Sequence, residues 1–198
     1  MKKTLEKRVE VLEEIVKQLG GKIPFSVKAS KVGDTFDIVG LQWKILDITD
    51  KGYLCLADRL KASKQFDSSC NDWRVSELRK YLNGEFWEML AAEVGAENVI
   101  SFKRDLLSLD GQTEFGTCED KVSLLNVDEY RKYRALISNA DYWWWLLSPW
   151  STPCNDYTTS VTVVSPSGYV YGFNFFNYCY GVRPFCIFSP EIFESEDK

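Results

Sequence analysis

Hydrophobic residues near the start of the chain recur at the spacing of an amphipathic helix. They are separated by alternating steps of four and three residues, as in a heptad seam, and are Leu5, Val9, Leu12, Val16 and Leu19. Two glycines, Gly20 and Gly21, follow where such a helix would end. Residues 1–21 are therefore predicted to form a helix, which either mediates homo-oligomerisation through residues 5–19 or packs on its own domain. A helix of about two heptads is too short to be stable alone, so both interpretations stay open.

The period changes to that of β-strands after residue 33. Apolar and polar residues alternate between residues 36 and 48, Gly40 interrupts the alternation, and a turn at residues 50–52 precedes the apolar run YLCLAD. This pattern predicts a hairpin or two successive paired strands. Helical spacing then returns, with an interruption predicted at Asn83-Gly84, in the apolar series Leu78, Leu82, Phe86 and Met89.

The middle of the chain predicts three further elements. A polar loop is expected at residues 110–120, a short strand at residues 122–125, and then a helix. Asp128 and Glu129 lie in the first turn of that helix, where acidic groups interact favourably with the helix dipole. The mixed order of helices and strands predicts an α+β fold, with one domain at residues 22–198 after the N-terminal helix.

Charge and composition exclude several classes of function. The 198 residues include 24 basic and 29 acidic side chains, for a net charge of -5, which disfavours nucleic-acid binding. Histidine is absent, which removes Ser-His-Asp and Cys-His catalysis and histidine-ligated metals, so we expect no enzyme. The first residues lack the apolar stretch of a secretory signal, and no run of 18 apolar residues occurs. We therefore expect no membrane insertion and a cytoplasmic or phage virion-associated protein.

The six cysteines form no CxxC pair and match no zinc-site spacing. Reduced thiols are the simplest interpretation in a chain without an export signal, and a disulfide framework is the alternative. No cofactor or metal ion is expected.

The last third of the chain is nearly uncharged and rich in aromatic residues. Residues 142–182 contain one charged side chain, Asp156, whereas the chain average of 27% would predict about 11. Five of the ten tyrosines lie between Tyr157 and Tyr180. Tyrosine among asparagine, serine and glycine is typical of adaptable recognition surfaces. A buried sheet core is the alternative interpretation.

Five residue types are missing from residues 151–190. Lys, Glu, Gln, Met and Trp number 44 in the chain, so about 9 would be expected in this window, but none occurs. Strands are naturally poor in Lys and Glu. These five types are also the ones that no codon ending in C or T can encode.

Several motifs in order carry a family resemblance. They are VGDTFDIVGLQWKILDI, NDWRVSELRKYLNGEFW, DKVSLLNVDEYRKY, YWWWLLSP, SPSGYVY and GVRPF. Over residues 32–188 the chain resembles C-type-lectin-fold variable proteins of diversity-generating retroelements, which occur in gut bacteria and their phages. The resemblance implies a C-type lectin-like fold of the formylglycine-generating-enzyme subtype. It also implies a region, about residues 150–180, in which asparagine codons are mutated to NNC or NNT codons to diversify a ligand-binding face.

The same resemblance implies which residues are fixed and which vary. The scaffold would comprise the WWLxSP entry and the GVRP exit of the variable region, namely Trp144, Trp145, Leu146, Ser148, Pro149, Gly181, Val182, Arg183 and Pro184. Arg183 is expected to make a buried charge-assisted hydrogen bond to a carboxylate or to carbonyls. The diversified, ligand-binding positions would be Cys154, Asn155, Asp156, Tyr157, Thr159, Tyr169, Tyr171, Phe173, Asn174, Phe175, Phe176, Asn177, Tyr178 and Tyr180. Two residues depart from the family pattern: Leu147 replaces a usual Arg, and Trp150 replaces a usual Gly.

Three functions follow as hypotheses. The first is recognition of a protein or cell-surface receptor by a diversified surface. The second is an undiversified lectin-like module of a phage tail or bacterial surface. The third is a formylglycine-generating-type oxidase, which needs a copper-binding cysteine pair, here Cys154 and Cys179 at presumed variable positions. The calcium-binding EPN or QPD triplet and the WND motif of sugar-binding lectins are absent. For the three adjacent tryptophans, Trp143 to Trp145, core packing is expected, whereas the tyrosines of residues 169–180 are expected to be exposed.

Overall fold

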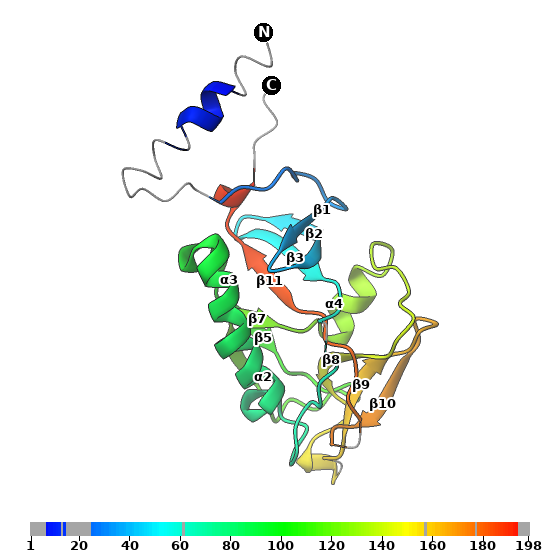
Figure 1. The fold of residues 1–198 in the computed structure, drawn as a ribbon. Coiled ribbons are helices and arrows are strands. Elements are labelled where there is room, and N and C mark those ends of the chain that lie inside the picture. The colour runs from blue at the N-terminus through cyan, green and yellow to red at the C-terminus, as the bar shows by residue number, and fades with distance from the viewer. Residues whose placement is uncertain are drawn as a thin grey trace.

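The computed structural model describes residues 7–12, 14, 25–60, 62–156, 158–176 and 178–193. These residues form an α+β fold, as predicted, in which a main β-sheet is flanked by helices and a second sheet lies beyond one of its ends (Figure 1). Of the predicted N-terminal helix, residues 7–12 are described; they are helical and exposed to solvent. The remainder of the predicted helix, except residue 14, lies outside the described residues.

The main sheet has the strand order β1-β2-β3-β11-β4, and a short strand, β7, also pairs with β11. The predicted pairing after residue 33 is confirmed, because β1 and β2 form an antiparallel pair and β2 pairs with β3. Val39 and Gly40 connect β1 to β2 with positive φ angles of 50° and 68°, as the turn at Gly40 requires. The strands are β1 Thr35–Ile38, β2 Leu41–Thr49, β3 Gly52–Ala57, β4 Val99–Ile100, β7 Val122–Ser123 and β11 Phe185–Phe188.

The helical segment beside the main sheet is continuous but irregular (Figure 1). It consists of α2 Glu77–Tyr81, one π-helical turn at Leu82–Phe86, and α3 Trp87–Val94. The interruption predicted at Asn83-Gly84 is this π-turn. The predicted apolar face is wrong at Met89, which is 47% exposed, because the wider turn shifts the buried face by one residue to Leu90.

The polar segment at residues 110–120 is not a loop throughout. Its last four residues form β6 Thr117–Asp120, which pairs with β5 Phe102–Asp105. The predicted strand and helix that follow are confirmed as β7 and α4 Val127–Lys132. Asn126 caps α4 in a capping box with Glu129, which explains why this short helix begins there. Short 3-10 turns lie at Trp73–Val75, Ala96–Asn98, Pro153–Asn155 and Pro190–Ile192.

The second sheet has the order β10-β9-β8 and is formed by the nearly uncharged segment. Its strands are β8 Trp144–Pro149, β9 Ser160–Val164 and β10 Val170–Asn174. Trp144 and Trp145 are both buried but belong to different hydrophobic clusters, because successive residues of a strand face opposite sides of a sheet. Core packing is therefore confirmed for these two tryptophans.

Candidate functional site

Backbone hydrogen bonds join the start of the WWLxSP entry motif to the start of the GVRP exit motif. The amide of Trp145 donates to the carbonyl of Gly181 at 3.1 Å, and the amide of Gly181 donates to the carbonyl of Trp143 at 2.8 Å. The expected scaffold residues of β8 are all buried, as are Gly181, Val182 and Pro184. The segment between Trp145 and Gly181, which contains β8, β9 and β10, is thus closed at its base.

Six aromatic residues within this segment or just before it have rings in contact with one another. We call them the aromatic face: Trp143, Tyr169, Tyr171, Phe173, Tyr178 and Tyr180. Tyr171 and Phe173 share one side of β10, and their ring centroids lie 5.4 and 5.1 Å from that of Trp143. The rings of Tyr178 and Tyr180 are stacked at 5.6 Å with an interplanar angle of 11°. The packing fixes the rings in a continuous cluster.

Much of the aromatic face is open to solvent. Tyr169, Tyr171 and Tyr178 are 66%, 46% and 48% exposed, whereas Phe173 and Tyr180 are half-buried against the core. The expectation of exposure therefore agrees with the structure at these three tyrosines. A contiguous exposed apolar patch on a folded domain is typical of a site that binds a partner.

The structure corrects one of the predicted ligand-binding residues. Phe175 is 4% exposed and packs in the main hydrophobic cluster, so its side chain is not available to a ligand. Its amide donates to the carbonyl of Thr159 just beyond the last β10–β9 pair, and its ring lies in the same cluster against which Phe173 packs. Phe176 is exposed, and Asn174 is half-buried. Tyr157 and Asn177 lie outside the described residues.

The first predicted loop is exposed and is held by two carboxylates from the segment before β6. Cys154, Asn155, Asp156 and Thr159 are all exposed. Asp110 accepts hydrogen bonds from the hydroxyl of Ser151 at 2.6 Å and from the amide of Asn155 at 3.1 Å, and Glu114 accepts from the backbone amide of Cys154 at 2.9 Å.

These hydrogen bonds also lower the pKa values of the two carboxyl groups. The pKa of Asp110 is lowered mainly by the hydroxyls of Ser108 and Ser151, and that of Glu114 mainly by Cys154. Both groups stay ionised at neutral pH. Asp110 holds the loop through the side chains of Ser151 and Asn155, and Glu114 holds it through the backbone amide of Cys154. Sequence reasoning missed this support, because acidic residues in a polar segment give no signal of their partner.

Two tryptophans lie beside the variable segment in ways that the sequence did not indicate. Trp143 is half-buried and central to the aromatic face, not part of the closed core expected for it. The ring of Trp150 lies over Gly172, where a Cβ atom would come within 2.3 Å of the indole. Gly172 therefore allows a large ring to cover the backbone of β10 on the side away from Tyr171.

Arg183 makes the hydrogen bond expected of it. Its Nε donates to the carbonyl of Ala57 at 3.1 Å, and its guanidinium carbon lies 5.1 Å from the ring centroid of Trp144. Burial lowers the pKa of Arg183, an effect opposed by the nearby Tyr142 and Asp58. This hydrogen bond links the GVRP exit motif to Ala57, the last residue of β3.

The described part of the chain contains neither a metal-binding cluster nor a membrane-spanning helix. It contains no group of three or more Cys, Asp or Glu side chains placed to hold a metal ion. It also contains no helix with the length and apolar character needed to cross a bilayer.

Comparison with known proteins gives one match. The model of a family described as "Domain of unknown function (DUF6273)" matches residues 48–190, from the end of β2 to beyond β11, and so includes the whole aromatic face. No curated protein and no solved structure matches the chain. Because the match covers more than two thirds of its residues, the chain belongs to the DUF6273 family.

Proposed function

We propose that this protein is a ligand-binding protein of a diversity-generating retroelement, with a C-type lectin-like fold of the formylglycine-generating-enzyme subtype. The rings of the aromatic face that lie within residues 150–180, together with the exposed residues Cys154, Asn155, Asp156 and Thr159, would form a diversified surface that recognises a protein or cell-surface receptor. The observation that carries the proposal is that the chain is closed by backbone hydrogen bonds between Trp143, Trp145 and Gly181, while the rings of Tyr169, Tyr171 and Tyr178 in the enclosed segment are exposed.

This arrangement separates the residues that maintain the fold from those that contact solvent. All five residues of β9 are buried, and β9 lies between β8 and β10. Substitutions on the exposed side of β10 and in the first loop can therefore alter the surface without removing core contacts. The five missing residue types are those that NNC and NNT codons cannot produce, which supports diversification from adenines of a template.

The chemistry of the aromatic face suits recognition of a protein or glycan surface. Tyrosine rings supply rigid apolar area with little loss of side-chain entropy, and their hydroxyls form hydrogen bonds with a partner. Aromatic residues also dominate the binding energy of many protein interfaces. The near absence of charge over residues 142–182 leaves hydrogen bonds and apolar contact as the main source of affinity.

The oxidase hypothesis is disfavoured by the surroundings of Cys154. Its thiol hydrogen-bonds with Glu114, and this contact, together with burial and the negative charge, raises the pKa of the thiol. A copper-binding or redox-active cysteine requires the thiolate, which such an environment disfavours.

A library experiment tests the proposal. Eight exposed positions are randomised with NNC and NNT codons and the proteins are displayed on yeast: Cys154, Asn155, Asp156, Thr159, Tyr169, Tyr171, Phe176 and Tyr178. We expect most variants to fold, because exposed substitutions typically change stability by within about 0.5 kcal/mol each. We also expect binders to an arbitrary test protein, such as lysozyme, to be selected from this library.

A matched library supplies the control. It randomises eight buried positions in or beside the same sheet: Leu146, Leu147, Ser160, Val161, Thr162, Val163, Val164 and Phe175. Most of its members should fail to fold, as judged by protease resistance on the cell surface. Equal loss of folding in the two libraries would mean that the variable segment is structural and would overturn the proposal.

A further inference from the structure

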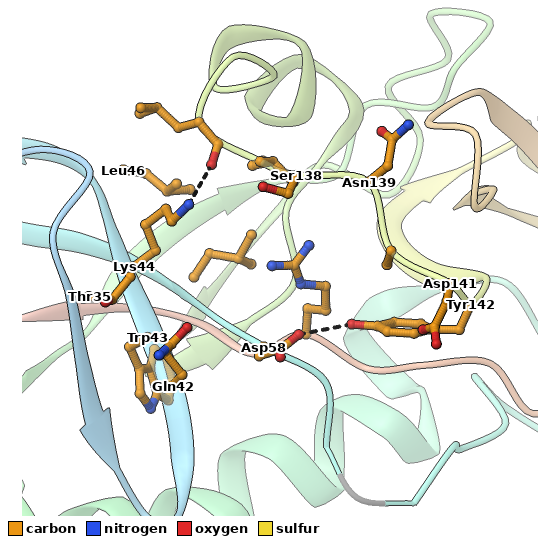
Figure 2. A pocket seen from close by; sticks show the side chains of 15 residues that line it. Thr35, Gln42, Trp43, Lys44, Leu46, Asp58, Ser138, Asn139, Asp141 and Tyr142 are labelled. Atoms are coloured by element: carbon orange, nitrogen blue, oxygen red, sulfur yellow. Dashed lines mark hydrogen bonds between the residues drawn. The ribbon is translucent and has the colours of Figure 1, made fainter.

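A pocket of about 340 Å³ lies beside Arg183, outside the proposed variable region. Its wall comes from β2, from the residue after β3, and from the segment that follows α4 (Figure 2). Lys44, Asp58, Ser138, Asn139, Asp141 and Tyr142 line it together with Arg183. The volume is in the range of small-molecule sites.

Arg183 contributes a cation whose hydrogen-bonding capacity is largely unused. Of its nitrogen atoms, only Nε donates a hydrogen bond to a described residue, and none forms an ion pair there. One face of the guanidinium is covered by Trp144, and the residue is partly buried. A desolvated cation without a paired carboxylate is costly. The two terminal nitrogens offer the forked geometry that binds a carboxylate with two hydrogen bonds.

The other polar groups of the pocket indicate which functional groups its ligand should carry. The Nζ of Lys44 donates to the carbonyl of Leu136 at 3.1 Å, which leaves two further protons for an anion (Figure 2). Asp58 accepts a hydrogen bond from the hydroxyl of Tyr142 at 3.1 Å (Figure 2), and burial is the main cause that raises the pKa of this tyrosine to about 12. The carboxylates of Asp58 and Asp141 also line the pocket and can accept hydrogen bonds from a ligand that carries donors.

We propose that this pocket binds a small carboxylic acid that also carries hydroxyl or ammonium groups. Its carboxylate would accept hydrogen bonds from Arg183 and Lys44, and its hydroxyl or ammonium groups would donate hydrogen bonds to Asp58 and Asp141. A uronic acid and a free amino acid are two sources of that chemistry. The lining residues lie outside residues 150–180, so the pocket would be the same in every diversified copy. The inference does not depend on diversification of the aromatic face.

The experiment follows the side-chain Nε-Hε signal of Arg183 by nuclear magnetic resonance in the full-length protein. The signal is identified by its absence in Arg183→Lys. Glucuronate is titrated against its neutral analogue glucose, and L-serine against L-serinamide. We expect a saturable shift with at least one acid and none with its neutral analogue, and the acid that produces the shift distinguishes the two sources.

Two lysine variants complete the test. Lys44→Gln should weaken binding of the active acid by about tenfold, because one charged hydrogen bond is lost. Lys103→Gln, which removes an exposed lysine from β5, should leave the affinity for the acid unchanged. The proposal is overturned if neither acid shifts the Arg183 signal in the millimolar range, if acid and neutral analogue act alike, or if Lys44→Gln has no effect.

Discussion

Replacing Asp120 with alanine is expected to lower the free energy of unfolding by about 3–5 kcal/mol. The Asp120 carboxylate is buried at the end of β6. One of its oxygens accepts a hydrogen bond from the indole N–H of Trp73 at 2.7 Å, and the other accepts one from the Nε–H of Arg79 at 2.7 Å. Trp73 is itself fully buried. Alanine would leave a buried N–H without an acceptor and the guanidinium without its counter-charge, and both are costly.

Equilibrium unfolding in urea measures this effect. Glu119→Ala is the matched control, because Glu119 is the exposed neighbour on the same strand and only its backbone carbonyl bonds with Arg79. The control should change stability by within about 0.5 kcal/mol. A similar small loss for Asp120→Ala would contradict the importance of this buried network.

Replacing Arg104 with methionine is expected to cost a comparable amount, about 3–5 kcal/mol. Its guanidinium is buried and makes two hydrogen bonds of 2.6 Å to the two carboxylate oxygens of Glu129. It also donates to the hydroxyl of Ser123 and to the carbonyl of Leu124. Because Glu129 is part of the capping box of α4, loss of the arginine also leaves the start of that helix less firmly held.

The same unfolding measurement checks this prediction, with Lys103→Met as the control. Lys103 is adjacent on β5 but exposed, so its loss removes no buried contact. The far-ultraviolet circular dichroism of Arg104→Met should stay close to that of the native chain before the transition. Equal stability of the two variants would show that the ion pair contributes little.

Local patterns in the sequence are sufficient to predict those helices and strands whose contacts are mostly with residues nearby in the sequence. The β1–β2 hairpin follows from alternation on both sides of a turn, and α4 follows from the acidic first turn at Asp128 and Glu129. The buried face of α3 was placed one residue too early, because a π-turn is not encoded by a simple period. For this reason the simple period predicts a buried Met89, whereas Met89 is exposed.

The candidate site was predictable only as a segment. Lack of charge and an excess of rings located it at residues 142–182, but could not distinguish the buried Phe175 from the exposed Phe176 beside it. That difference depends on where β10 stops pairing with β9. The supporting residues Asp110 and Glu114, and the pocket beside Arg183, bring together segments remote in sequence, so no local pattern reveals them.

Sequencing the gene in many members of one population tests the central claim most directly. We predict substitutions concentrated in the codons of Tyr169, Tyr171, Phe173, Tyr178 and Tyr180 and of residues 154–159, with altered codons ending in C or T. A near-copy of this segment with adenines at the differing positions should lie nearby, beside a reverse transcriptase gene. The codons of β9 and of residues 181–188 should be unchanged, because these residues hold the buried scaffold. Substitutions spread evenly along the gene, or an invariant segment without a near-copy, would contradict the account.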